Sequence, residues 1–490
     1  MRATKTWRSL VAVTVLAAVA SACLPNYPDP PAVPTRVVGS SPAPGGLMIP
    51  AATPIALAFS GAVAPASMTI SLSPAAALGS AQWLLGNKAV AFTPPAPLTA
   101  ATTFTLTVSG NDAAGHALST TPITFTTAPA TAVLSATHPR LLLKGTTRTR
   151  LVNALTTGSP AATRFKAAID NHLVNNNLYD YEPWWGALLG QLTGTASYCT
   201  DSVARIDQWV AAAEADIAAN VNPEVAGDSY LHVGDGIGGL ALVWDWCPTF
   251  RTAGMTARWS AFAQQTLFNV WHPDTATWGS RSAPWSGWGT DNPRNNYFLS
   301  FVHATLLWGA AANGEHPAAA GWLAQAQVKI GHDLPIIHTT ETPGGGLLEG
   351  TGYGTAIKRL LFLQHIWEAS TGQRWADVSS SSEAWIRYEL ASIVPGNDFF
   401  APIGDQARIS DAPFTDYQRE ILLALAELHR GRPWGRLARN RAGVFLPQME
   451  RLESSVFDFL YGTADAGTAA VMPLTYHAPG TGHVFTRSSG

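Results

Sequence analysis

The sequence carries little charge for its size. Asp, Glu, Lys and Arg make up 13% of its 490 residues, against about a quarter in an ordinary soluble domain. The net charge is −3, so the chain lacks the basic excess that phosphate binding needs, and nucleic acid is not expected as a partner. Disorder does not explain the low charge, because 47% of the residues are apolar and 18 are Trp. The length predicts two to four domains.

Cysteine is scarce as well, with Cys23, Cys199 and Cys247 the three in the chain. No Cys-x-x-Cys spacing occurs, and we expect neither a metal site nor a cofactor. Cys199 and Cys247 form an even pair that an oxidising compartment would allow to join as a disulfide. Two separately buried thiols are an equal alternative.

Long apolar runs are missing beyond the N-terminus. Residues 1–22 combine a basic start, the apolar run Leu10 to Ala20 and small residues before Cys23, which is the pattern of a secretory signal peptide. Cys23 directly after it suits lipidation of a bacterial lipoprotein, and a plain exported protein is the alternative. We therefore expect an outer-membrane or cell-surface lipoprotein, or a periplasmic or extracellular protein. Any membrane contact would be through this anchor.

Residues 23–35 are rich in proline and predict an extended linker. From 36 to 128 short apolar runs alternate with small polar residues, as in Phe104, Leu106 and Val108, and Pro and Gly recur at intervals of about ten residues. This texture predicts an all-β sandwich. Its order resembles the bacterial Ig-like modules of surface proteins, which mostly serve as spacers.

The texture changes to long helical patterns over residues 138–470. Helices are expected at 148–156, 161–174, 184–194, 202–219, 236–246, 256–270, 297–313, 317–331, 356–368, 383–393 and 414–430. Ten or more helices with few strands favour an all-α toroid over an alternating βαβ fold, and no recognisable repeat of 30 to 50 residues points to a helical array. Residues 471–490 predict one strand at His483–Arg487, which either pairs with an earlier segment or starts a truncated β-sandwich domain.

The most unusual stretch is GGGLLEGTGYG at residues 344–354. An apolar segment, a glycine loop and a helix are also how a nucleotide-binding loop begins. The glycine spacing is G-x-G-x-G and no Gly-Lys-Ser/Thr follows, so neither phosphate-binding fingerprint is present. The alternative is that the glycines expose Glu349 and Tyr353, with Lys358 and Arg359 near enough to lower the pKa of the tyrosine. A tyrosine packed under the loop is the structural alternative.

A second concentration of aromatic and polar residues lies at 271–297. It contains Trp271, Trp278, Trp285 and Trp288, followed by Arg294, Asn295, Asn296 and Tyr297. Long loops of this composition are often binding surfaces. Flat rings suit sugar C–H groups, and Asn and Arg suit hydroxyls and carboxylates. At least two of the tryptophans are expected to be core residues instead.

Together, several short motifs resemble polysaccharide lyases of the heparinase II/III and alginate-lyase type over residues 138–490. They are His138–Leu142 (HPRLL), Ala241–Trp246 (ALVWDW), Asn295–Tyr297, Gly346–Tyr353, Pro402–Asp405 and Gly482–Ser488. The resemblance implies an incomplete (α/α) toroid followed by the start of an antiparallel β-domain. It also implies cleavage of acidic, uronic-acid-containing polysaccharide by β-elimination.

The resemblance also assigns roles. Asn296, or its neighbour Asn295, would neutralise the substrate carboxylate, and Tyr353 would be general base, general acid or both. His483 is the candidate histidine from the C-terminal strand. Substrate-binding roles fall on Trp285, Trp288, Arg294, Tyr297, Glu349 and Lys358, and Glu349 is expected to orient its loop rather than react.

Two alternatives remain open at this point. A glycoside hydrolase on a similar toroid would need two carboxylates, for which Asp235, Asp245, Asp291, Glu349 and Asp405 are the candidates. Of these, Asp245 is expected to be structural. A non-catalytic surface protein that binds glycans or mediates adhesion would need only the Ig-like module and the aromatic loop.

Overall fold

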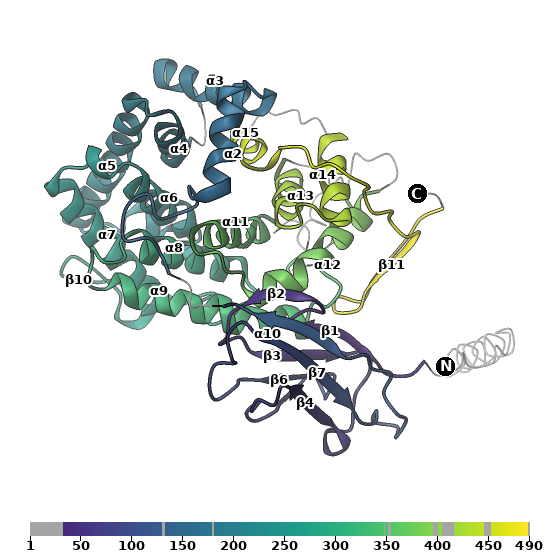
Figure 1. The fold of residues 1–490 in the computed structure, drawn as a ribbon. Coiled ribbons are helices and arrows are strands. Elements are labelled where there is room, and N and C mark those ends of the chain that lie inside the picture. The colour runs from purple at the N-terminus through teal and green to yellow at the C-terminus, as the bar shows by residue number, and fades with distance from the viewer. Residues whose placement is uncertain are drawn as a thin grey trace, which may run out of the picture. The chain divides into compact units, whose positions relative to one another are not determined.

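The structure is a computed structural model (Figure 1) that describes residues 33–129, 133–178, 181–346, 348–350, 354–394, 400–403, 416–444 and 452–488. The predicted signal peptide and Cys23 lie outside the described residues, as does most of the 23–35 linker.

The N-terminal strands form a β-sandwich. One sheet has the order β1 (Val37–Ser41), β3 (Ile55–Phe59), β6 (Ala89–Phe92), β5 (Gln82–Leu84), and the other has β2 (Gly46–Ile49), β8 (Ile123–Thr127), β7 (Thr103–Ser109), β4 (Thr69–Ser73). The alternation read from the sequence is that of β7, where Phe104, Leu106 and Val108 are buried and the residues between them face outward. The predicted sandwich is confirmed.

A large helical region follows. Its α-helices are α2 (Gly145–Thr156), α3 (Pro160–Asn175), α4 (Pro183–Thr193), α5 (Ala196–Ala218), α6 (Val233–Trp246), α7 (Ala253–Trp271), α8 (Asn296–Ala311), α9 (Ala319–Val328), α10 (Leu334–Thr340), α11 (Gly354–Thr371), α12 (Ala376–Ser392), α13 (Asp416–Leu428), α14 (Pro433–Val444) and α15 (Leu452–Tyr461). Short 3₁₀ segments and the two-residue strands β9 (Thr277–Trp278) and β10 (Arg281–Ser282) lie between some of them. No helix within the described ranges has the length and apolar character that crossing a bilayer requires.

Several of these helices run parallel to one another. Along α6 and α8, Gly234 N–H donates to Ser300 Oγ near one end (2.9 Å), and the rings of Trp244 and Trp308 meet near the other (centroids 5.1 Å apart). The ring of Phe362 on α11 stacks on Trp184 of α4 and contacts Phe457 of α15.

Helices α11 and α15 also run parallel to each other. Phe362 contacts Phe457, and His365, further along α11, lies 3.0 Å from the hydroxyl of Tyr461 at the end of α15. Lys358 pairs with Glu420 near the start of α11 and of α13. Arg359, near the start of α11, binds Asp235, near the start of α6, so the first turns of α6, α8 and α11 lie at one end of the region.

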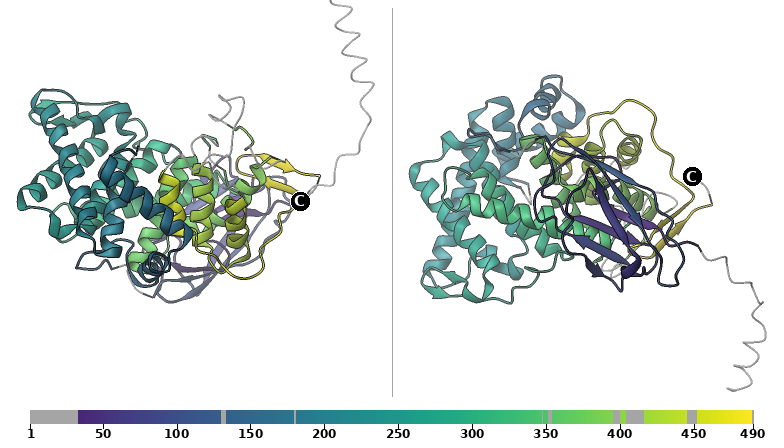
Figure 2. Two further views of the ribbon diagram at one scale, coloured as in Figure 1. Left: turned by 90° about the horizontal axis from the view of Figure 1, so that it is seen from above. Right: turned by 60° about the horizontal axis from the view of Figure 1, so that its bottom comes forward.

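The first and last helices of the region are neighbours. α15 packs against α3 and α2, and the blue and yellow helices lie beside one another in Figure 1 and in both views of Figure 2. Within this pairing, the rings of Phe165 and Phe459 stack with centroids 5.2 Å apart. The helical region thus returns on itself over about 300 residues of sequence.

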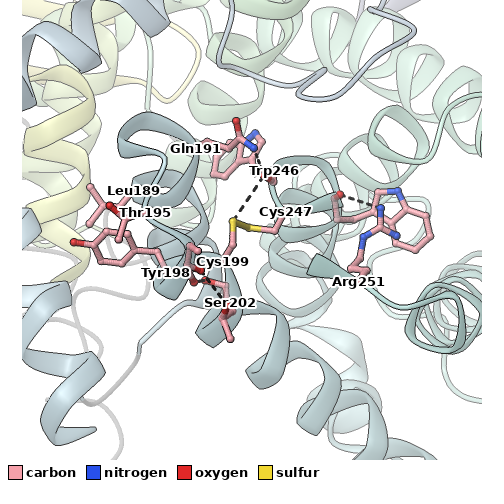
Figure 3. The surroundings of a disulfide bond; sticks show 12 residues. Leu189, Gln191, Thr195, Tyr198, Cys199, Ser202, Trp246, Cys247 and Arg251 are labelled. Carbon is pink, nitrogen blue, oxygen red and sulfur yellow. Dashed lines mark hydrogen bonds between the residues drawn. A yellow bond between two sulfur atoms is a disulfide. The ribbon is translucent and has the colours of Figure 1, made fainter. Parts of the chain in front are cut away.

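A disulfide joins Cys199, near the start of α5, to Cys247, the residue that ends α6 (Figure 3). Gln191 on α4 donates from its side-chain amide to the backbone oxygen of Trp246, next to the bridge. Of the two alternatives that the sequence left open for these cysteines, the structure has the disulfide.

The last described strands form a hairpin of β11 (Thr475–Ala478) and β12 (His483–Thr486). The strand expected at His483 therefore pairs with an earlier segment. The hairpin also holds the start of the glycine-rich stretch, because Tyr476 Oη donates to Gly344 O (2.7 Å) and Gly480 N–H donates to Pro343 O (2.8 Å).

Candidate functional site

The two segments that stand out in the sequence meet at the start of α8. Glu349, from the glycine-rich stretch, accepts hydrogen bonds from Asn295 Nδ2 (3.0 Å) and from the backbone N–H of Asn296 (2.8 Å). Asn295 is the N-cap of α8, and its Oδ1 accepts from the backbone N–H of Tyr297 (2.9 Å). The Glu349 carboxylate therefore lies at the positive end of α8 and ties the two loops together.

Asn295 and Asn296 are both 6% exposed but differ in what their side chains do. Both ends of the Asn295 amide are occupied by the cap and by Glu349. Asn296 instead lines a small pocket together with Glu349, and among the described residues its side-chain amide has no hydrogen-bond partner. Asn296 is thus the asparagine of the pair whose side-chain amide the described residues leave without a hydrogen bond.

The same pocket contains a histidine that the sequence analysis did not select. His338, on α10, is 5% exposed and lines the pocket with Asn296, Thr342 and Glu349. Its ring packs edge-on against Trp385, with centroids 5.3 Å apart. His338 stands six residues before the glycine run in the sequence, and this nearness is the signal that would have pointed to it.

Two polar pairs flank the start of α8. Arg294 forms a two-pronged ion pair with Glu341, in which Nε lies 2.5 Å from Oε2. Hydrogen bonding to Glu341 raises the pKa of Arg294. Tyr297 donates its hydroxyl proton to Asp228 Oδ1 (3.0 Å) on the segment that precedes α6. Arg294 and Tyr297, which were predicted to bind substrate, therefore lie at the same end of the helical region as Asn296.

A partly exposed charge pair joins α11 to α6 near the same end of the region. Arg359 on α11 binds Asp235 on α6, with Nη2 to Oδ2 at 2.7 Å. Burial raises the pKa of Asp235, but the charge of Arg359 and bonds from His232 and Arg359 outweigh it and hold the pKa below its usual range. His303 on α8 is buried beside them, and burial, aided by the charge of Arg359, lowers its pKa to about 4. The imidazole of His303 is therefore neutral near pH 7.

Two further predicted site residues have structural contacts. Lys358 is buried, forms an ion pair with Glu420 (2.9 Å), and lies over the ring of Phe457. His483 Nδ1 lies 2.9 Å from Tyr388 Oη on α12. Neither of these contacts joins the residue to Asn296. Tyr353, the predicted base or acid, lies outside the described residues.

The tryptophans of the 271–297 loop divide between core and surface. Trp278 is 1% exposed, and Trp285 donates to Asn269 O (2.7 Å) while packing against Tyr230. Trp288 is 58% exposed and is the ring of this loop that is open to a ligand.

Two other motifs of the sequence are joined to each other. Asp245 of the ALVWDW motif is fully buried and accepts from the backbone N–H groups of Arg140 (2.9 Å) and Leu141 (2.8 Å) and from His138 Nδ1 (2.7 Å). The HPRLL motif is thereby fixed to α6. The expectation that Asp245 is structural is confirmed.

Residues 31–127 match the family model described as a bacterial Ig-like domain, in agreement with the β-sandwich. No curated protein matches the chain.

Among solved structures, L,D-transpeptidase 3 from Mycobacterium tuberculosis is 24% identical over 19% of this chain and 37% of that chain, with a TM-score of 0.15. An L,D-transpeptidase from Mycobacterium tuberculosis H37Rv is 24% identical over 19% of this chain and 40% of that chain, with the same TM-score. The chain thus spans less than half the length of these two proteins, and likenesses with so low a TM-score support no inference about fold or function.

Proposed function

We propose that the helical region is an incomplete (α/α) toroid that cleaves uronic-acid-containing polysaccharide by β-elimination. The observation that carries the proposal is the Asn296 amide, which lines a pocket beside Glu349 and has no partner among the described residues. The parallel course of α6 with α8 and of α11 with α15 supports the toroid, because the inner helices of such a ring all point the same way. The Ig-like match supports a cell-surface setting, and the disulfide supports export.

The chemistry requires a neutral hydrogen-bond donor at the carboxylate of the sugar. A base removes the proton next to that carboxylate, the electron pair forms the new carbon–carbon double bond, and the bond to the glycosidic oxygen breaks. While the carboxylate is negative the proton is held tightly, so a donor that stabilises the enolate-like intermediate lowers the barrier. The N–H groups of Asn296 are that donor in this proposal, and Glu349 fixes the backbone that carries them.

Proton transfer falls to Tyr353 and, as a second candidate, to His338. Tyr353 lies four residues after Glu349, and its role rests on the resemblance to the lyases. His338 rests on its place in the pocket wall. Trp288, Arg294 and Tyr297 would contact neighbouring sugars.

The hydrolase alternative loses most of its carboxylates to structural bonds. Asp235 is paired with Arg359, Asp245 holds the HPRLL backbone, and Glu349 holds the start of α8. Asp291 is exposed on its loop, and Asp405 lies outside the described residues. A hydrolase needs two carboxylates across one bond, and the described residues present no such pair at the pocket. The glycan-binding alternative is favoured by exposed Trp288 alone.

The test is a panel of uronic-acid polymers assayed for the near-ultraviolet absorbance of unsaturated ends. We expect turnover of at least one polymer, an inactive Tyr353→Phe variant, and a rate about a hundred- to a thousandfold lower for Asn296→Ala. Asn295→Ala tests the choice between the two neighbours. It removes the helix cap and one of the two bonds to Glu349 and lowers stability by about 1 kcal/mol, while the Asn296 amide remains.

Full activity of Asn296→Ala or Tyr353→Phe would contradict the assigned roles. Cleavage products without a double bond would favour a hydrolase. Binding of a polymer without turnover would favour the glycan-binding alternative.

A further inference from the structure

A large cavity lies apart from the pocket at Asn296 and shares no lining residue with it. Its volume is about 1160 Å³, and it is lined by α2 and α3 on one side and by α13, α14 and α15 on the other. It thus lies where the first and last helices of the region meet. A cavity of this size is large enough for a small organic ligand.

Arginine dominates the charged groups on the cavity wall. The described lining includes Arg150, Arg164, Arg419 and Arg439, against the carboxylates of Asp458 and Asp465. The lining therefore carries an excess of positive charge. The starts of α2 and α3 also line the cavity, at Gly145 and Ser159, and add the partial positive charge of helix N-termini.

Two of these guanidinium groups are buried with N–H groups left over. Arg419 is 6% exposed. Its Nε donates to Ala442 O (2.9 Å) and its Nη2 pairs with Asp458 (2.5 Å), but its buried Nη1 has no hydrogen-bond partner among the described residues. Arg439 is 8% exposed. Its Nη2 reaches Glu427 at 3.4 Å, and within the described part of the chain its buried Nε and Nη1 have no hydrogen-bond partner.

Leaving such groups unpaired is costly. A buried N–H without an acceptor loses its hydration and gains nothing in return, and the cost is larger when the group is charged. Burial lowers the pKa of Arg439, with neighbouring Arg430 adding to the effect, and burial likewise lowers the pKa of Arg150. These charges are therefore only partly compensated by the acidic residues around them.

The geometry points to an oxyanion-binding site in this cavity, in which a carboxylate or phosphate group of a small ligand accepts hydrogen bonds from Arg419 and Arg439. The planar guanidinium presents paired N–H donors that match the oxygens of such groups. Arg439 and Arg419 both line the cavity, and their N–H groups without an acceptor among the described residues are buried in its wall. Arg164, whose side chain is 50% exposed, stands beside them at the open side and pairs with Asp458.

Calorimetric titration of the purified protein tests this. The two probes are inorganic phosphate and glucuronate, added at constant ionic strength set with chloride. We expect saturable binding of at least one probe, and the stronger of the two identifies the ligand as a phosphate or a sugar acid. Arg439→Gln should bind about tenfold more weakly or worse, because it removes a charged donor. Arg439→Lys keeps the charge but not the paired donors, and its affinity for the probe should lie between those of wild type and Arg439→Gln.

Arg432→Gln is the matched control. Arg432 is exposed directly before α14 and does not line the cavity, so this variant loses the same charge and should bind within about twofold of wild type. Far-ultraviolet circular dichroism checks that each variant folds, and if Arg439→Gln does not, Arg439→Lys carries the test. No saturable binding of either probe, or equal affinity in wild type and in the folded Arg439 variant, would overturn the proposal.

Discussion

Asn295 and Asn296 are identical side chains at adjacent positions, and the sequence offered no way to choose between them. The choice depends on where α8 begins. The residue just before the first helical turn turns its side chain back to the helix N–H groups, which occupies Asn295 and leaves Asn296 facing the pocket. Helix boundaries are the least certain part of any prediction from sequence, so the sequence alone could not assign the two roles. The pairing of Glu349 with the start of α8 joins positions 53 apart and has no local signal.

Buried histidines make stability depend on pH. Burial lowers the pKa of His365 to about 4, whereas in the unfolded chain it titrates near 6.5. Between these values the unfolded state binds more protons, so stability is lost as the pH falls from about 6.5 to 4. Burial raises the pKa of Glu389 to about 7, so this group makes the folded state more stable as the pH falls, opposite to His365. The contribution of His365 is therefore measured as a difference between variants.

We predict that His365→Gln reduces the loss of unfolding free energy between pH 7 and pH 5 by roughly 1 to 2 kcal/mol. Urea unfolding at several pH values measures it. Tyr461→Phe is the control, because it removes the hydrogen bond to His365 Nδ1 but keeps the imidazole. It should lower stability and keep most of the slope, because burial is the main reason that the pKa of His365 is low. Identical slopes for His365→Gln and wild type would contradict the prediction.

At the scale of elements, the regular patterns predicted most of the helices but not α10, α14 and α15. The eleven expected helices each overlap an observed helix, from α2 to α13. The apolar run Leu334–Ile337 before the glycines is part of α10, where it continues a π-helical turn after α9, and is not the strand with which a nucleotide-binding loop begins. Helix α14 begins with Pro433 and α15 is ten residues long, and neither was expected although each has an apolar face.

The disulfide joins α5 to the end of α6. It closes a loop between positions 48 apart. We predict that Cys199→Ser with Cys247→Ser lowers the free energy of unfolding by about 2 to 4 kcal/mol, mainly because the unfolded chain regains freedom.

Denaturant unfolding of the variant measures this loss. Wild type under reducing conditions should show the same loss. A double variant that unfolds at the same denaturant concentration as wild type would contradict the predicted loss of stability.

At the scale of the molecule, the apolar residues change from short alternating runs to helical spacing near residue 130. This change predicted a β-sandwich followed by helices, and the structure has both parts in that order. What the texture did not predict is which distant segments meet. The C-terminal hairpin contacts the glycine-rich stretch through a bond between positions 132 apart, from Tyr476 to Gly344. Such pairings depend on the whole chain and leave no mark in local composition.

We predict that Tyr476→Phe loosens the glycine-rich stretch without unfolding the helices. Losing one buried hydrogen bond of about 1 kcal/mol should speed amide exchange in a peptide covering 343–350 about fivefold. Hydrogen exchange with mass spectrometry measures it. Tyr198→Phe, which loses its bond to Asp170 on α3, is the control and should leave that peptide unchanged.

The position of the hairpin also has a consequence in time. During synthesis the stretch at 344–350 leaves the ribosome well before residues 475–486 exist, so its contacts with Tyr476 and Gly480 cannot form yet. The helices around it can pack earlier, because their partners are closer in sequence. A chain stopped before the hairpin would then be largely folded yet have a loose pocket, and the pocket beside Asn296 would be the last part of the molecule to mature.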